Sequence, residues 1–418
     1  LSFFTREFYK GGDDITEAIS KKLSLETREA EVLKREPGGE MGRVEDCING
    51  VLEDICHDIN ISIDYFENQY DKRVEEVFLT GGTSNCIGLV ETLEAAKAHP
   101  NYSVKLGPNQ GRGVSCGFWF NFGGDTCVSL NITPDGTVTL TEGNPDIGGS
   151  RASMSMMAAE ELGVPYERVR TVIADTASLG LNDVTDGSRV TFAVGLATIE
   201  AARAAKREMC KRAAMVWGID EEAVVWEDGA ARPSGPNAGK HDPMSLADIA
   251  AIASNTGGPI AGHSEINAEG AGVSFATHMV DTEVDPESGA VKILRYTVFQ
   301  DAGKAVHPDY VEGQFQGGAV QGIGWALNEA YIYGEDGVLQ NPGFLDYRVP
   351  VASDLPMIDT VILEIPNPGH PYGVRGVGET SIVPPLAAIA NSVSAAAGVR
   401  MTSLPMSPPK VLKAIQTG

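Results

Sequence analysis

Cysteine and basic residues are both scarce in this sequence, and each shortage excludes a class of protein. The six cysteines are scattered and form no CxxC pair, so we expect reduced thiols in the cytoplasm rather than a disulfide framework or a zinc site. The chain has 32 basic against 57 acidic residues, a formal net charge of -25. Because such a surface repels phosphate, we expect neither nucleic acid nor an anionic membrane as a partner.

Several motifs are missing as well. No apolar run reaches the roughly 18–20 residues of a membrane span, and the N-terminal LSFFTREFYK lacks the features of a signal peptide. No GxxxxGK[ST] loop is present, so an ordinary nucleoside triphosphate with Mg²⁺ is not indicated. No GxSxG segment marks a hydrolase nucleophile. The seven histidines lie too far apart to form a metal site of their own, so we predict no metal bound by side chains.

The amino-acid composition divides the 418 residues into two parts. Residues 1 to about 95 are rich in charge and in helix formers. They predict a strand over 3–10 that ends in a Gly turn, helices over 12–36 and 42–68, and a buried strand over 77–79. A Gly-Gly turn at 81–82, with cap candidates at 83–84, then leads into another helix. We predict that residues 1–95 form one lobe.

From about residue 96 onward glycine, alanine and valine become more frequent, and short strands alternate with helices. The turns PDG at 134–136 and ESG at 287–289 predict hairpins between β-type runs. Two Ala-rich helices are expected near 151–162 and 190–216, and a polar loop over 228–242. The whole pattern predicts an α/β fold with mixed sheets and helices (α+β), in which residues 96–418 form the second unit.

Four glycine-flanked segments in this second part stand where a helix begins. They pair glycine with amide, hydroxyl or guanidinium donors: PDIGGSRAS at 145–153, DGSRV at 186–190, VEGQFQGGAVQGIG at 311–324 and RGVGETS at 375–381. Each segment alone is explained by a glycine-eased turn with a cap. Together they indicate one large, polar, phosphate-bearing ligand held mainly by backbone and amide groups.

The motifs NQGRGVSCGFWFNFGG, PDIGGSRAS, VIADTASLG, DAGKAVHPDYVEGQFQGGAVQGIGWAL, NPGFLDYRVP and GVRGVGETSIVPPLAAIANSV occur in one order. Residues 96–418 resemble, in these motifs, the C-terminal half of the molybdenum-binding large subunit of the xanthine dehydrogenase, aldehyde oxidase and carbon monoxide dehydrogenase family. That resemblance implies a molybdopterin-binding fold, a molybdenum-molybdopterin cofactor, and oxidative hydroxylation of an aldehyde or N-heterocycle.

The resemblance also implies roles for individual residues. Glu379, in the GVGE motif, would be the catalytic general base, against the simpler interpretation that it caps a helix. Ser188 and Arg189 would contact the phosphate or nucleotide tail, and Gln314 would hydrogen-bond the pterin. The other expected cofactor-binding residues are Gly148, Gly149, Ser150, Arg151, Gln321, Gly322 and Gly378. Many family members carry Gln where this chain has Gly149, so one donor near the metal ligands is expected to be missing.

The family's large subunit has a preceding half that supplies the other wall of the cofactor site, and this sequence does not contain it. The resemblance therefore implies that a second large-subunit chain completes the site, together with iron–sulfur and flavin subunits. In place of that half, residues 1–93 resemble the C-terminal part of the actin-like ATPases of type IV pilus assembly, in GGDDITEAI, EAEVLKRE and LTGGTSNCIGLVE. Both phosphate loops of those ATPases are absent, so we expect no ATPase activity. The change from one resemblance to the other indicates a junction near residue 95, which would be a gene fusion, a recombination product or a cloning junction.

Two other functions stay open. An unfilled cofactor cleft would hold serines (Ser150, Ser153, Ser188), histidines (His263, His278, His307, His370) and carboxylates (Asp146, Asp301, Glu379), from which an esterase-like hydrolase site could be built. Alternatively, the chain is a non-enzymatic assembly module. Its actin-like lobe would then dock on a pilus-type partner or form a homodimer.

Overall fold

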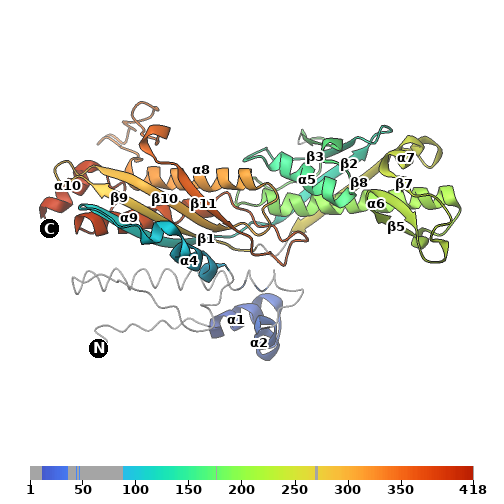
Figure 1. The fold of residues 1–418 in the computed structure, drawn as a ribbon, viewed down its shortest axis with the longest axis horizontal. Coiled ribbons are helices and arrows are strands. Elements are labelled where there is room, and N and C mark those ends of the chain that lie inside the picture. Colours follow the sequence, from blue (N-terminus) through green and yellow to red (C-terminus); the bar gives the residue numbers. More distant parts are fainter. Residues whose placement is uncertain are drawn as a thin grey trace.

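The computed structural model describes residues 12–35, 44, 47, 88–175, 177–268 and 272–417. Within these residues two four-stranded sheets, each with its own helices, follow one another along the long axis of the molecule (Figure 1). We call them the first lobe and the second lobe. The expected α/β fold of mixed sheets and helices is confirmed.

The first lobe contains the sheet β1–β9–β10–β11, made of Gln110–Trp119, Ser274–Val284, Val291–Asp301 and Ile358–Leu363. Neighbouring strands are antiparallel except for β10 and β11, which are parallel. Helices α8 (Pro308–Leu327) and α9 (Pro385–Ala397) cover the sheet, and α10 (Pro408–Thr417) ends the described chain. Gly111 and Gly113 let α9 lie on β1, because a Cβ at either position would come within 2.1 Å of a helix carbonyl oxygen.

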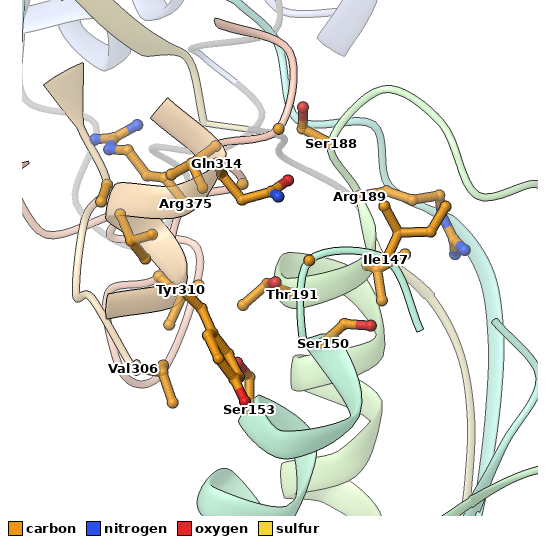
Figure 2. Close-up of a pocket in the computed structure, with 18 of the residues that line it drawn as sticks. Ile147, Ser150, Ser153, Ser188, Arg189, Thr191, Val306, Tyr310, Gln314 and Arg375 are labelled. Atoms are coloured by element: carbon orange, nitrogen blue, oxygen red, sulfur yellow. The ribbon is translucent and has the colours of Figure 1, made fainter. Parts of the chain in front are cut away.

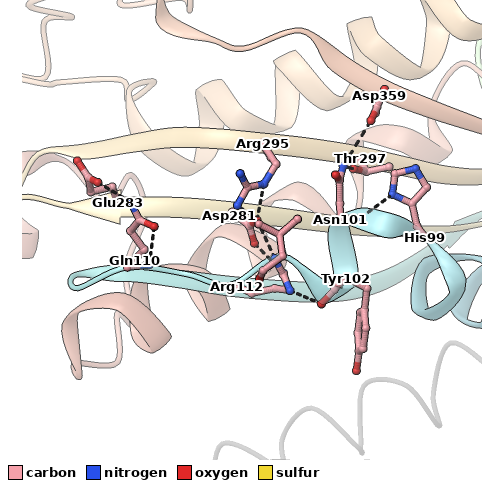
Figure 3. Close-up of polar contacts among 12 residues, drawn as sticks. His99, Asn101, Tyr102, Gln110, Arg112, Asp281, Glu283, Arg295, Thr297 and Asp359 are labelled. Atoms are coloured by element: carbon pink, nitrogen blue, oxygen red, sulfur yellow. Dashed lines mark hydrogen bonds and ion pairs between the residues drawn. The ribbon is translucent and has the colours of Figure 1, made fainter.

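Buried charge fixes the strand register in this sheet. Asp281 on β9 is only 2% exposed, and it pairs with Arg112 on β1 and Arg295 on β10 at 2.8 Å each (Figure 3). Gln110 donates a hydrogen bond to Glu283 across the same strand pair, at 2.7 Å. A carboxylate removed from water needs such partners. A shift of one residue would therefore break the ion pairs as well as the apolar pattern.

The second lobe contains the sheet β4–β3–β2–β8, made of Val169–Ile173, Val138–Glu142, Gly124–Ile132 and Ile260–Ala268. Helices α5 (Ser150–Leu162) and α6 (Gly195–Trp217) pack on it around a core that includes Leu130, Leu140, Met154 and Ile199. At its far end lie the small sheet β5–β6–β7 and helix α7: Val224–Glu227, Ala230–Pro233, Met244–Ser245 and Leu246–Ala251.

Several sequence predictions are confirmed at this level. The helices near 151–162 and 190–216 are α5 and α6, and α6 is preceded by a π-helical turn at Val190–Val194. The PDG and ESG turns connect β2 to β3 and β9 to β10. The polar loop expected over 228–242 was wrong in part, since it contains β6. The helical region expected over 12–36 is interrupted: α1 covers Gly12–Leu23 and α2 covers Thr27–Arg35, with Ser24 between them at φ 54°.

The N-terminal predictions are described only in part. Three predicted features lie outside the described residues: the strand over 3–10, the strand over 77–79 and the Gly-Gly turn at 81–82. Of the predicted helix over 42–68, only residues 44 and 47 are described. Helix α4 (Leu89–Ala98) packs on the first lobe, where Ala96 contacts the core residues Met279 and Phe299. Thr277 also donates a hydrogen bond to Thr92, at 2.9 Å.

One stretch among the described residues, 380–397, is long and apolar enough to pass as a membrane span by length and composition. It consists of the 3₁₀ turn Thr380–Ile382 and helix α9. Half of it is buried inside the protein, where α9 packs on β1 and β9. A core helix of this kind passes the same test.

Candidate functional site

A cavity of about 330 Å³ lies where the two lobes meet (Figure 2). Its wall is made by four chain segments that are far apart in sequence: residues 147–153, 185–191, 302–314 and 374–379. Each segment includes part of one of the four glycine-flanked motifs. The structure thus brings Gly148, Ser150, Ser188, Arg189, Gln314, Gly378 and Glu379 to one cavity.

The turn before α5 fits closely against the start of α8. Gly148 and Gly149 have φ of 66° and 82°, the left-handed region that glycine occupies without strain. A Cβ on Gly148 would lie 2.5 Å from the Gln314 side chain, and one on Gly149 would lie 2.2 Å from the ring of Tyr310. Glycine at both positions therefore lets the second lobe reach the amide of Gln314 and the ring of Tyr310 on the first lobe.

The carboxylate of Glu379 is held by a serine from the other lobe. The Ser188 hydroxyl donates a hydrogen bond to Glu379 Oε2, and the backbone N–H of Glu379 donates back to Ser188 Oγ, both at 3.0 Å. Glu379 stands at the N-cap position of the Thr380–Ile382 turn but makes no side-chain cap hydrogen bond. The side chain is therefore not used as a helix cap, and it lines the cavity.

Two buried amides support the Glu379 loop from behind. Asn121, 0% exposed, donates to the carbonyl of Gly376 at 3.1 Å and accepts from its N–H at 2.9 Å. Gln300, also 0% exposed, donates to the carbonyl of Val377 at 3.2 Å. Sequence reasoning missed both residues. The sequence offered no clear signal for Asn121, because its neighbours Phe120 and Phe122 are 37% and 39% exposed while its own amide is buried.

Neither of the two arginines in the cavity wall, Arg189 and Arg375, offers its guanidinium to the cavity. The Arg189 side chain is fully buried and points away from the cavity (Figure 2). It donates to the carbonyls of Gly123, Asp183 and Asp125 at 2.6 to 3.1 Å, and also to Thr126. The predicted contact of Arg189 with a phosphate tail is therefore not favoured by this geometry, since it would leave these carbonyl groups without their donor.

Arg375 is likewise internal. Its guanidinium forms an ion pair with Asp301 Oδ2 at 2.9 Å and donates to the carbonyl of Val273 at 2.7 Å. Burial raises the pKa of Asp301 to about 6, although the charge of Arg375 opposes the shift. The pair anchors the start of the 375–379 loop to the end of β10.

Four predicted residues do not line the cavity. Gly149 faces Tyr310, as described above. Arg151 lies on the surface in an ion pair with Asp146 at 3.2 Å. Gln321 is exposed on α8. Gly322 is a packing residue, because a Cβ there would lie 2.6 Å from Pro385 on α9.

The alternative Ser–His–carboxylate site is not formed among the described cavity residues. Ser188 is hydrogen-bonded to Glu379, and the Ser150 hydroxyl is buried without a hydrogen-bond partner. The His307 ring stacks on Tyr310, with centroids 3.8 Å apart. A serine–histidine hydrogen bond does occur between Ser129 and His263, at 3.0 Å, but both residues lie on strands β2 and β8, outside the cavity wall.

The described part of the chain contains no group of three or more His, Cys, Asp or Glu side chains that could hold a metal ion. What the cavity wall includes instead is two carboxylates (Asp186 and Glu379), one amide side chain, the hydroxyls of three serines and two threonines, and the backbone of several glycines. Such a set suits a ligand that brings its own metal ligands and is recognised by hydrogen bonds.

Comparison with known proteins agrees with this description. Residues 87–356 match the family model of the molybdopterin cofactor-binding domain, and residues 2–104 match that of the type IV pilus assembly protein PilM. The xanthine dehydrogenase molybdenum-binding subunit of Escherichia coli O157:H7 is 31% identical over 359 residues, 80% of this chain and 46% of the relative. The nicotine 6-hydroxylase large subunit of Paenarthrobacter nicotinovorans is 32% identical over 306 residues, 69% of this chain and 36% of the relative.

Solved structures show the same fold. Quinoline 2-oxidoreductase from Pseudomonas putida 86 superposes with a TM-score of 0.67 at 24% identity, covering 78% of this chain and 44% of that one. Carbon monoxide dehydrogenase from Oligotropha carboxidovorans gives 0.66 at 18% identity, covering 96% and 51%. The chain thus spans about half the length of the relatives and solved chains it matches, or less. The prediction of a molybdopterin-binding fold with molybdenum-molybdopterin as the family's cofactor is confirmed, and the chain belongs to the molybdopterin cofactor-binding domain family of molybdenum hydroxylase large subunits.

Proposed function

We propose that this chain forms one wall of the cofactor site of a molybdenum hydroxylase and supplies its general base, Glu379. The observation that carries the proposal is the position of this carboxylate. It lies in the cavity between the lobes, hydrogen-bonded to Ser188, next to the amide of Gln314 and the backbone of Gly378. A Cβ on Gly378 would lie 3.6 Å from Gln314 Oε1 and 3.7 Å from Ser188 Oγ, so these three groups surround one point.

The residues of the cavity fit a pterin. Its ring nitrogens and carbonyl require hydrogen-bond donors and acceptors, which Gln314, Ser150 and the backbone of Gly148 and Gly378 offer. Ser150 supports this assignment most directly, because its hydroxyl is buried without a partner in the cavity wall and buried hydroxyl groups are normally hydrogen-bonded. The missing side chain at Gly378 leaves room for a planar ring to approach the backbone, because a Cβ there would meet no atom closer than 3.6 Å.

This chain offers the phosphate of the cofactor few cationic contacts. Of the basic side chains in the cavity wall, Arg189 and Arg375 are occupied by protein oxygens, and Lys304 pairs with Glu364 at 3.0 Å. We therefore propose that a second large-subunit polypeptide contributes the cationic contacts and the opposite wall. Iron–sulfur and flavin subunits would complete the electron path, in line with relatives named as subunits of larger enzymes.

The bound cofactor would supply the oxygen-transfer chemistry and accept the two electrons of the oxidation. The protein itself would supply acid–base catalysis. Within the described chain only Ser188 hydrogen-bonds the Glu379 carboxylate, and it uses Oε2. Oε1 is then the oxygen that can take a proton from an oxygen nucleophile in the cavity. The substrate class we propose is an aldehyde or an N-heterocycle, whose electron-poor carbon is open to such attack.

Elemental analysis tests this function. The chain is purified alone and after co-expression with a large-subunit polypeptide that covers the remaining length of the relatives, and molybdenum and phosphorus are measured per chain. We expect both elements to be retained in the co-expressed complex at a constant ratio. A complex that forms but contains neither element contradicts the proposal.

We propose separately that the residues before Gly88 form a lobe of their own, related to the pilus assembly protein. Helices α1 and α2 share a small core of Ile15, Ile19 and Ala30, apart from the cores of the other two lobes. Because α4 packs on the first lobe, we set the boundary before residue 88 rather than at 95. Light scattering on the full chain and on a chain starting at residue 88 tests whether this lobe causes dimerisation. We expect dimers only with the full chain, and the same oligomeric state for both chains would contradict this.

A further inference from the structure

The Ser188 hydroxyl has its one hydrogen committed within the protein. A serine hydroxyl has one donor hydrogen and two acceptor lone pairs. Here the hydrogen goes to Glu379 Oε2, and one lone pair accepts the Glu379 N–H. What remains is a single acceptor position. A phosphate oxygen needs a donor, so this hydroxyl cannot serve a phosphate while it holds Glu379.

The backbone at Ser188 is strained, and neighbouring residues hold it in that conformation. Ser188 has φ 55°, directly after Gly187 at φ 54°. A residue with a side chain is disfavoured in this left-handed region, and such strain persists where neighbouring structure determines it. The neighbour is Gly376: a Cβ there would lie 1.8 Å from the Ser188 carbonyl oxygen. The Phe122 N–H fixes the other side by donating to the carbonyl of Gly187 at 2.8 Å.

This contact joins the two lobes. Ser188 lies between β4 and α6 of the second lobe, whereas Glu379 lies between β11 and α9 of the first lobe. The orientation of the carboxylate is thereby tied to the seating of one lobe on the other. A group that must accept a proton within a narrow geometry gains from such an anchor, since small displacements of a reacting group lower rates strongly.

From this geometry we propose that Ser188 is the positioning residue of Glu379: its hydroxyl holds Oε2 and the Glu379 backbone so that Oε1 faces the cavity. The inference rests on the proposed function of Glu379 and reassigns Ser188 from the phosphate contact that the family resemblance implied.

The test uses three variants. Ser188→Ala removes the hydroxyl and keeps the backbone strain, whereas Ser188→Gly removes the hydroxyl and relieves the strain. Ser129→Ala, on strand β2 outside the cavity wall, is the matched control. Hydrogen exchange of the Glu379 amide is measured by mass spectrometry on the full chain without cofactor. Crystal structures of the wild-type chain and of Ser188→Ala locate the carboxylate.

We expect the Glu379 amide to exchange about tenfold faster in both Ser188 variants, because its acceptor is lost. The control should match the wild type, and the carboxylate should leave its wild-type position in Ser188→Ala. Glycine should restore thermal stability relative to alanine without restoring slow exchange. Unchanged exchange together with an unmoved carboxylate in Ser188→Ala overturns the inference.

The catalytic consequence is measured in the loaded complex. Ser188→Ala should lower kcat about tenfold or more while KM and molybdenum content stay at wild-type values. A loss of molybdenum with kcat per molybdenum unchanged would return Ser188 to cofactor binding and overturn the inference. If the wild-type complex binds no molybdenum, the proposed function fails, and the exchange and crystallographic results still decide whether Ser188 holds Glu379.

Discussion

A buried glutamate behind the cavity makes the stability of this protein depend on pH. Glu142 ends strand β3 with its side chain 0% exposed. Its Oε2 accepts the N–H of Asn144 at 2.6 Å, while Oε1 is buried without a partner. Asn144 in turn donates to Thr185 of the cavity wall at 2.8 Å. Burial raises the pKa of Glu142 to about 7, although the hydrogen bond from Asn144 opposes the shift.

The size and sign of the effect follow from this shift. The pKa is 4.5 when the group is solvated and about 7 in the folded chain, so between these values the folded state binds more protons than the unfolded state. The free energy of unfolding must then fall as the pH rises through this window. A shift of this size corresponds to about 3 kcal/mol. That stabilisation is fully present below pH 4.5 and is lost above about pH 7.

The perturbation is Glu142→Gln, which keeps the shape and removes the titration. Urea unfolding from pH 4.5 to 8 should show that the variant loses up to about 3 kcal/mol less stability over this range than the wild type. Asp301 titrates with the same sign, so the comparison between variant and wild type isolates Glu142. Glu265→Gln on the surface is the control. Parallel pH profiles for wild type and Glu142→Gln would refute the reasoning.

Two further pairs of variants distinguish residues needed for folding from residues needed for cofactor binding. Gly376→Ala should lower the melting temperature, because its Cβ would lie 1.8 Å from the Ser188 carbonyl oxygen. Gly378→Ala should fold normally and bind less molybdenum, because its Cβ points into the cavity. Equal melting temperatures for the two variants would contradict this. Gln314→Ala should reduce the molybdenum content of the complex, while Gln321→Ala, on the exposed face of α8, should leave it unchanged. Equal losses in both would contradict the assignment of Gln314.

The sequence predicted the convergence of the four segments because glycine and polar donors at helix starts are local signals. Gly148 and Gln314 illustrate this, since a glycine turn and an amide at a helix start are both visible without tertiary structure. The direction in which a side chain points is not a local property. The motif DGSRV predicts that Arg189 binds an anion. In the structure its guanidinium donates instead to the carbonyls of Gly123 and Asp125 at the start of β2.

Packing glycines were similarly indistinguishable from site glycines. Gly322 occurs in the same motif as Gln314, but the reason for glycine there is the contact of α8 with Pro385 on α9. That distinction depends on which helices meet, and a single sequence does not contain it. The hydrogen bond between Ser188 and Glu379 joins residues 191 positions apart. A single sequence does not show that these two residues meet.

The most direct test of the account is Glu379→Gln in the complex with its large-subunit partner. Molybdenum content is measured together with the reduction of an acceptor dye by a panel of aldehydes and N-heterocycles. Because the variant keeps the shape of the side chain and the Ser188 contact but not the base, we predict wild-type molybdenum content and a loss of turnover on every substrate that the wild type oxidises. A variant that keeps its molybdenum and turns over at the wild-type rate would contradict the role of Glu379.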